Sequence, residues 1–311
     1  MDDLVTVFGG GGFLGRYVAQ ELLRAGARVR VAGRDPTNAF YLKPLAALGQ
    51  AQFVAADVTR PDSVRRAVQG ATAVINLVGI LKGRFDAIHV DGARNVAEAA
   101  AAAGAQALVQ VSAIGADPAS SSAYGRSKGQ GEAAVRAAFP AATIVRPSIL
   151  FGPEDAFVNR FASMIARLPV LPVVRGGTKF QPAWVVDVAR AVGKAALDPG
   201  TYAGKTYELG GPQILSMAEL IRWIATSIGY SPHIVALPDS MAAMMARIGA
   251  FVPGAPITWD QWLMLQHDNV VAPGAAGFDM FGIDPAPLAA AASQWLVRYR
   301  RNGRFSLSTS A

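Results

Sequence analysis

Tyr124 and Lys128 are the residues of this sequence whose types and spacing point most directly to chemistry. Four residues apart in a helix, they lie on the same face. A nearby ammonium lowers the pKa of a phenol, so we expect Tyr124 to exchange a proton with a carbonyl or an alcohol. Ser112 is a hydroxyl that could polarise such a carbonyl. A Tyr-x-x-x-Lys spacing is common by chance, so its weight depends on the elements around it.

A glycine-rich stretch near the N-terminus supplies that context. Residues 5–8 favour a strand, four glycines follow, and apolar residues then recur at helical spacing. The spacing fits G-x-G-x-x-G at 10, 12 and 15, and G-x-x-G-x-x-G at 9, 12 and 15. Such a turn lets a diphosphate approach bare amides at a helix N-terminus, although a glycine-rich turn without a ligand is the alternative. The predicted cofactor-binding residues here are Gly9, Gly12, Phe13, Leu14 and Gly15.

The end of the next predicted strand bears on which dinucleotide binds. An NAD site usually carries an acid here for the ribose 2′-hydroxyl, whereas this chain has Arg34 near the expected spacing. A guanidinium pairs well with a 2′-phosphate, and Gly33 removes a side chain that would crowd it. NADP(H) is therefore the preferred cofactor. Asp35 keeps NAD(H) open.

Two further strand ends are candidates for the same site. Asp57, followed by Val58, places a carboxylate where it can accept from an adenine amino group. After the following strand, small and apolar residues let the cofactor ribose pass, and these are Leu77, Val78 and Gly79. With the glycine-rich turn in place, Lys128 is also expected to hold the nicotinamide ribose, and Tyr124 to exchange its proton during hydride transfer.

Strand and helix patterns alternate through the first half of the chain. Strands are predicted at 27–32, 52–55, 73–78, 107–111 and 143–146, and helices at 62–69, 85–103 and 124–139. This alternation predicts an α/β fold, a Rossmann-type doubly wound parallel sheet with a smaller, mixed C-terminal domain. We expect residues 1–150 to form the dinucleotide-binding domain, with a helix at 184–197 returning to it. Residues 151–183 and 198–311 then form the smaller substrate or partner domain.

The composition narrows the function classes. The chain has 311 residues, of which 52% are hydrophobic and 16% charged, enough for a large core. The absence of cysteine excludes disulfides, thiol catalysis and Cys-ligated metals, and the three histidines are too far apart to suggest a metal site. No transmembrane span is predicted, and Asp2 and Asp3 precede the first apolar run, so no signal peptide is evident.

Together these motifs resemble the extended or atypical branch of the short-chain dehydrogenase/reductase superfamily. The resemblance rests on the turn glycines, Asp57-Val58, Tyr124/Lys128 and the segment 181–189. The stretches 120–128, 135–140, 144–155 and 282–288 are similar to one family within it, the dehydrogenase-like accessory subunit of respiratory complex I and its bacterial relatives. That resemblance implies a tightly held NADPH, with Pro147 in the cofactor site, and a mainly structural role among complex I subunits. It also implies a cytoplasmic protein, or one held peripherally on the cytoplasmic face of the inner membrane.

Two departures from an active extended dehydrogenase stand out. Such enzymes usually place a hydroxyl two residues beyond the first Ser, where this chain has Ile114. The first Asn of their N-V-x-G-T-x-N pattern, which supports the proton relay, is His89 here. Only Ser112 or the loop 120–122 could then polarise a carbonyl. A Tyr–Lys pair retained to bind ribose without turnover fits this pattern.

The C-terminal region carries two candidate contact surfaces. The region 241–265 is rich in Met and Trp, and is either an adaptable partner or membrane surface or the smaller domain's own core. A basic cluster follows, made of Arg298, Arg300, Arg301 and Arg304, and it suits an anionic partner or a solvated helix end. The net charge of +7 comes without a nucleic-acid-binding motif, so DNA and RNA are not expected partners.

Three functions remain open from the sequence. The favoured one is an NADP(H)-binding accessory or assembly subunit of complex I, with a mainly structural cofactor. The second is an active NAD(P)H-dependent reductase, dehydrogenase or epimerase acting on a carbonyl, sterol or sugar-like substrate through Tyr124 and Lys128. The third is a regulator that reports its nucleotide state to a partner.

Overall fold

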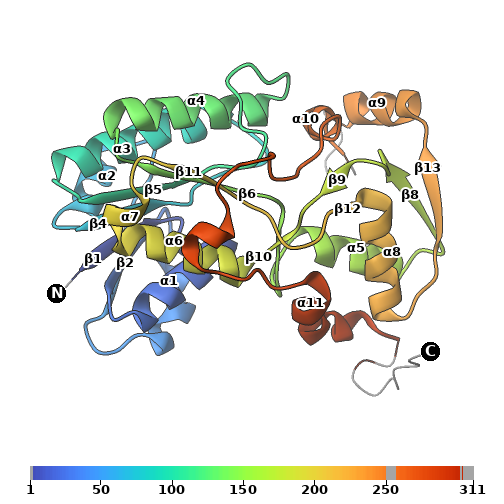
Figure 1. Cartoon of the computed structure of the whole chain (residues 1–311), viewed down its shortest axis with the longest axis horizontal. Coiled ribbons are helices and arrows are strands. Elements are labelled where there is room, and N and C mark those ends of the chain that lie inside the picture. Colours follow the sequence, from blue (N-terminus) through green and yellow to red (C-terminus); the bar gives the residue numbers. More distant parts are fainter. Residues whose placement is uncertain (1–2, 250–256, 302, 304–311) are drawn as a thin grey trace. The chain divides into compact units, whose positions relative to one another are not determined.

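The computed structural model describes residues 3–249, 257–301 and 303, and the chain divides into two compact units (Figure 1). The first unit comprises residues 1–147, 185–209 and 271–284, and the second comprises 148–184, 210–270 and 285–311. No helix within the described ranges is long and apolar enough to cross a membrane.

The first unit is built on a seven-stranded sheet whose strand pairs are all parallel. Its order is β11-β6-β5-β4-β1-β2-β3, so the predicted doubly wound α/β fold is confirmed. The strands are β1 (Leu4–Phe8), β2 (Arg28–Gly33), β3 (Ala51–Ala55), β4 (Ala73–Asn76), β5 (Ala107–Val111), β6 (Thr143–Pro147) and β11 (Thr206–Leu209). The order reverses between β1 and β4, which is where open sheets of this kind bind their ligands.

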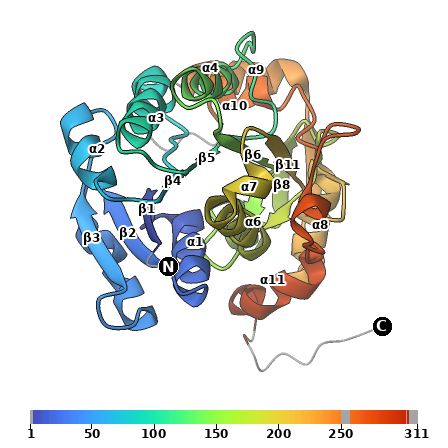
Figure 2. The same ribbon diagram turned by 60° about the vertical axis from the view of Figure 1, so that its left-hand side comes forward.

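Helices cover both faces of this sheet, as Figures 1 and 2 show. One face carries α2 (Pro61–Val68), α3 (Gly92–Ala102) and α4 (Ala123–Ala138), and the other carries α1 (Phe13–Arg24) and α6 (Val185–Leu197). The remaining helical segments of this unit are the 3₁₀ segment η1 (Pro36–Leu45), the π-helical turn η2 (Asp86–Asp91), α7 (Pro199–Tyr202) and η3 (Phe278–Phe281).

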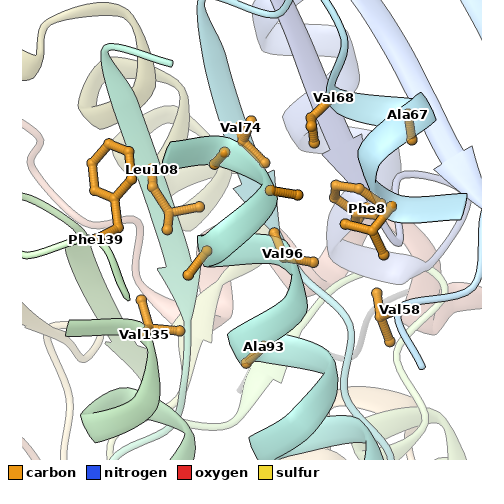
Figure 3. Close-up of a cluster of buried hydrophobic side chains, with 14 of the residues drawn as sticks. Phe8, Val58, Ala67, Val68, Val74, Ala93, Val96, Leu108, Val135 and Phe139 are labelled. Atoms are coloured by element: carbon orange, nitrogen blue, oxygen red, sulfur yellow. The ribbon is translucent and has the colours of Figure 1, made fainter. Parts of the chain in front are cut away.

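The core between the sheet and the α2–α3–α4 layer is apolar and closely packed (Figure 3). Phe8, Val74 and Leu108 project from neighbouring strands and meet Val96 of α3 and Val135 of α4. All five are buried. Because strands covered on both faces must be apolar throughout, β1, β4 and β5 read as nearly continuous hydrophobic runs.

Two segments that the sequence analysis placed in the smaller domain lie in the first unit. Strand β11 pairs with β6 and so extends the sheet. The segment 271–284 packs beside it: the Phe281 ring lies 4.6 Å from the rings of both Tyr202 and Tyr207, measured between centroids. Sheet pairing and aromatic packing therefore draw these segments away from the smaller unit.

The second unit packs short strands around α5, α8 and α11. Its core joins Ile165 of α5 to Leu220 and Ile224 of α8, with Trp295 of α11 stacked on Trp184 at 5.5 Å. The helices are α5 (Phe157–Ile165), α8 (Met217–Ile228), α9 (Asp239–Ile248), α10 (Trp259–Met264), α11 (Leu288–Leu296) and the 3₁₀ turn η4 (Val297–Tyr299). Two-residue strands β7 (Leu150–Phe151), β9 (Lys179–Phe180), β10 (Ala183–Trp184) and β12 (Leu215–Ser216) accompany the longer pair β8 (Val170–Val174) and β13 (His233–Leu237).

Candidate functional site

The turn between β1 and α1 shows a separate reason for each of three glycines. Gly9 has a φ of 78°, the left-handed conformation that a side chain disfavours. A Cβ on Gly15 would overlap the Gly9 carbonyl oxygen and lie 2.6 Å from the Gly10 Cα, so only glycine lets α1 approach β1 this closely. A Cβ on Gly12 would meet only the Gly9 oxygen, at 3.2 Å. Gly12 thus leaves open space at the turn, and G-x-x-G-x-x-G is the template whose first glycine makes the turn.

Helix α1 begins with its backbone amides facing this turn. Its N-cap is Gly12, which supplies no side-chain cap, and its first turn carries no acidic residue. Phe13 and Leu14 are its first two residues, and Leu14 is buried. An uncapped, positively polarised helix N-terminus of this kind suits an anionic ligand such as a diphosphate.

Arg34 and Asp57 stand at the ends of β2 and β3. A Cβ at Gly33 would meet nothing within 4 Å, so the space beside Arg34 is open. The Asp57 carboxylate accepts from the Thr59 amide (2.9 Å) and hydroxyl (2.8 Å). Partial burial raises the pKa of Asp57, but these bonds and the charge of Arg34 outweigh it and lower the pKa overall. Val58 is buried beside it.

Asp35, the acid that left NAD(H) as a possible cofactor, is the N-cap residue of η1. Its Oδ1 accepts from the Thr37 amide (3.0 Å) and hydroxyl (2.6 Å), and its Oδ2 from the Asn38 amide group (3.3 Å). Hydrogen bonds from Thr37 lower the pKa of Asp35, so the group is an ionised helix cap.

The end of β4 is held by a buried amide pair that the sequence analysis missed. Asn76 donates to Gln110 across β4 and β5 (2.8 Å) and accepts from the Val78 amide (3.1 Å). Gln110 in turn donates to the Val111 carbonyl (3.0 Å), which also accepts a longer bond from Lys128 Nζ (3.4 Å). The sequence signal for this pair was an amide side chain in each of two strands that are otherwise apolar.

The predicted residues Leu77, Val78 and Gly79 follow β4, and the last of them lies near Lys128. The Leu77 amide donates to Phe8 (3.0 Å), which continues the sheet. Gly79 is exposed, and a Cβ there would lie 3.2 Å from Lys128 Nζ. The buried Lys128 ammonium therefore lies next to the backbone at Gly79.

The Tyr124–Lys128 pair lies on α4 as expected, but the phenol pKa moves the other way. Burial raises the pKa of Tyr124 to about 12, so the predicted lowering by the ammonium is wrong. Burial also lowers the pKa of Lys128 to about 8, while the Glu132 carboxylate acts in the opposite direction. The cost of desolvating a phenolate exceeds the attraction of Lys128, whose Nζ lies 5.9 Å from the Tyr124 ring centre.

Ser112 and Pro147 lie close together at the carboxyl ends of the neighbouring strands β5 and β6. The Ser112 amide donates to Val145 (2.7 Å) and the Ile114 amide to Pro147 (3.1 Å). The Ser112 hydroxyl is buried and has no hydrogen-bond partner among the described residues. A buried hydroxyl without a partner costs stability unless a ligand or water satisfies it.

A partly buried ion network adjoins Lys128 through Glu132, and it was not predicted from the sequence. Arg146 of β6 binds Glu132 of α4 through two nitrogens (2.9 and 2.6 Å) and also reaches Glu208 of β11 (3.4 Å). Glu132 is four residues from Lys128 on the same helix, and this spacing was the available signal.

In the second unit the two candidate contact surfaces behave differently. Met241, Met244 and Ile248 of α9 are each about half exposed, which favours the surface interpretation for the described part of 241–265. Arg298 instead bonds to the Pro153 carbonyl (2.9 Å), and Arg300 bonds elsewhere in its own unit. Residues 250–256 and Arg304 lie outside the described residues.

Comparisons with known proteins place this geometry in a family. The model of the NAD dependent epimerase/dehydratase family matches residues 5–210. The chain is 35% identical over 316 residues to NADH dehydrogenase (ubiquinone) 1 alpha subcomplex subunit 9, mitochondrial, of Arabidopsis thaliana, covering 96% of this chain and 79% of that protein. It is also 35% identical over 243 residues to the ceramide reductase of Caulobacter vibrioides, covering 76% and 74%.

Among solved structures, the NADPH-dependent quinone oxidoreductase QOR2 of Escherichia coli, complexed with NADPH, shares the fold. Its TM-score is 0.76 at 21% identity, covering 93% of this chain and 99% of that one. The glycine turn, the sheet order and these matches agree on a nucleotide-cofactor-binding fold. The chain therefore belongs to the NAD dependent epimerase/dehydratase family, and to the same sequence family as the subunit 9 proteins of NADH dehydrogenase (ubiquinone).

Proposed function

We propose that this chain is an NADP(H)-binding accessory or assembly subunit of respiratory complex I in which the cofactor is mainly structural. The observation that carries the proposal is a site with the groups that would hold a dinucleotide but an altered catalytic set. Ile114 occupies the position of the usual second hydroxyl, and His89 occupies that of the Asn that supports the proton relay. The identity to subunit 9 over nearly the whole chain supports the complex I partner.

The same geometry favours NADP(H) over NAD(H). Asp35, the acid that could bind a ribose 2′-hydroxyl, already accepts three hydrogen bonds in the cap of η1. Arg34 has open space beside Gly33, where a 2′-phosphate would approach. A guanidinium pairs with a phosphate through charge-assisted bonds that a bare ribose cannot supply.

In this proposal the residues of the site have binding roles. The backbone amides of Phe13 and Leu14, at the start of α1, would hold the diphosphate, and Asp57 the adenine edge. Lys128, whose ammonium lies next to Gly79, would hold the nicotinamide ribose together with Tyr124. The bound dinucleotide stabilises the native state in proportion to its affinity and concentration.

We place the partner-facing surface on α9 and α10 of the second unit. Met241, Met244 and Ile248 recur at helical spacing on one exposed face of α9. Flexible Met side chains suit a large apolar partner, and the identity to subunit 9 supports complex I subunits as that partner. We propose that this contact lies on the cytoplasmic face of the inner membrane. We further propose that α9 and α10 also contact the membrane surface directly.

An active reductase is the second candidate, and a specific observation favours it. Tyr124 and Lys128 are both present, and the unpartnered Ser112 hydroxyl could donate to a substrate carbonyl. The relative in Caulobacter is a ceramide reductase, which makes a lipid carbonyl the first substrate class to try. In that reaction NADPH would supply the hydride to the carbonyl carbon, and Tyr124 would supply the proton to the carbonyl oxygen.

Tyr124→Phe separates the two candidates. A structural cofactor site predicts that this variant raises the NADPH dissociation constant only about threefold, since one hydrogen bond is removed. It also predicts that the wild type shows no NADPH oxidation with long-chain keto-lipid or quinone substrates. Turnover by the wild type that Tyr124→Phe abolishes would instead establish the reductase.

A further inference from the structure

We propose that His89 is a positioning residue that joins η2, α4 and the chain after β4 through a neutral imidazole with its proton on Nδ1. The inference rests on the proposed cofactor-holding role of Tyr124 and Lys128, because it assigns the side chain that keeps them in place. Three sets of contacts lead to this conclusion.

The hydrogen bonds around His89 allow one arrangement of protons. The Ile80 backbone N–H can only donate, and it points at Nε2 from 3.0 Å, so Nε2 is the unprotonated nitrogen. On the other side, Nδ1 lies 2.9 Å from the Ser127 hydroxyl. That hydroxyl donates its own proton to the Tyr124 carbonyl (2.9 Å), so it must accept from Nδ1–H. The chain of donors thus runs from Ile80 through His89 and Ser127 to Tyr124.

The ring also packs directly against the residue it positions. The edge of one ring meets the face of the other between His89 and Tyr124, at 5.5 Å and 88°. Phe85 stacks on His89 at 5.5 Å and 26°. Phe85 also lies 6.1 Å from Tyr124, so the three rings contact one another, and the buried imidazole limits where the Tyr124 ring can lie.

The backbone brings His89 to this position through a close helix contact. His89 lies within the π-helical turn η2, and a Cβ on Gly131 of α4 would overlap the His89 carbonyl oxygen. Single π turns in otherwise α-helical segments often mark functional positions. Glycine at 131 lets η2 approach α4 closely enough for the His89–Ser127 bond.

The charges around the ring agree with a neutral imidazole. The titratable groups that face it from α4 are Lys128 and Tyr124, and a Cβ on Gly79 would lie 3.2 Å from Lys128 Nζ and 3.7 Å from His89 Nε2. Burial first, and the Lys128 charge second, lower the pKa of His89 to about 3. In a protonated ring, Nε2 would also carry a hydrogen, and its N–H would face the Ile80 N–H, so that two donors would repel each other.

Nitrogen-15 NMR of the imidazoles tests the assignment on the protein without cofactor. The chain has three histidines, so the spectrum of a His89→Phe variant identifies the His89 signals. We expect a protonated Nδ1 and an unprotonated Nε2 at neutral pH, with both shifts unchanged down to pH 5. Protonation of both nitrogens above pH 5, or a proton on Nε2, would overturn the inference.

Variants test the positioning role. His89→Phe keeps a ring but loses both hydrogen bonds, so we expect the NADPH dissociation constant to rise about tenfold. His89→Gln can accept from Ile80 again and should recover part of that loss, whereas a merely space-filling role predicts Phe as the better replacement. Wild-type affinity in His89→Phe would refute positioning.

A double-mutant cycle in melting temperature distinguishes this inference from the proposed function. Ser127→Ala should destabilise the wild type but have little further effect in His89→Phe, because the two residues act through one hydrogen-bonded chain. This cycle needs no cofactor. If the wild type binds no NADP(H), the proposed function fails while the cycle still decides the role of His89, and additive effects would overturn it.

Discussion

Alanine at Gly12 and at Gly15 should damage the protein in two different ways. At Gly15 the new Cβ would overlap the Gly9 carbonyl oxygen and lie 2.6 and 2.7 Å from Gly10 backbone atoms, which cannot move aside like a flexible side chain. Overpacking of this kind costs about 1–3 kcal/mol or more, and the roughly 1 kcal/mol gained in helix propensity does not offset it. For a net loss near ~2 kcal/mol we expect a melting temperature lower by about 4–8 °C.

At Gly12 the fold should survive while the nucleotide is lost. The added Cβ meets only one oxygen, at 3.2 Å, so the free energy of unfolding should change by less than about 1 kcal/mol. The same Cβ fills the space through which a diphosphate reaches the amides of α1. Losing one or two charge-assisted bonds should weaken NADPH binding about 100-fold, which is about 2.7 kcal/mol.

Differential scanning calorimetry and an NADPH fluorescence titration measure the two effects. Gly193→Ala in α6 is the matched control, because its Cβ would meet only the Glu21 side chain of α1, at 3.8 Å, so stability should not fall and affinity should hold. Normal NADPH affinity in Gly12→Ala would show that the turn is not the nucleotide site. A wild-type melting temperature in Gly15→Ala would refute the close-approach argument.

Three more outcomes follow from the site. Arg34→Ala should raise the NADPH dissociation constant about tenfold or more and leave that for NADH almost unchanged, as paired titrations would show. Arg146→Met should destabilise the fold by about 3 kcal/mol in urea unfolding because Glu132 loses its main partner, and Glu132→Gln in the same chain should restore most of it. The pKa of His89 is about 3 in the folded state and 6.5 when unfolded, so the unfolded state binds the extra proton between these values. Stability from this group is complete above pH 6.5 and falls as pH drops toward 3, and His89→Phe should flatten that slope.

The sequence predicted the central fold because local patterns and sheet position agree there. Strand β5 was predicted at its observed bounds, and β2, β3, β4 and β6 lie within two residues of prediction. The 3₁₀ segment η1 was missed because it lacks helical periodicity and contains Pro44. The predicted helix at 85–103 is divided into η2 and α3, because the π turn depends on how closely α4 approaches through Gly131.

The positions of the candidate residues at strand ends were predictable from the sequence, whereas their pKa values and hydrogen bonds were not. Strand ends in an α/β sheet meet at one edge, which is why Arg34, Asp57 and Gly79 could be identified from spacing. The direction of the Tyr124 pKa could not, since it depends on burial by residues distant in sequence. The role of Asp35 in the η1 cap likewise required the fold of that segment.

A pull-down from membranes solubilised in mild detergent tests the proposed complex I role most directly. The tagged full chain and its Gly12→Ala variant would be recovered in parallel and their partners identified by mass spectrometry. We predict that the wild type brings down core complex I subunits and that Gly12→Ala recovers less of them, since the cofactor stabilises the bound form. Recovery of the wild type alone, with bound NADPH but without complex I subunits, would contradict the accessory role and leave the reductase as the function to pursue.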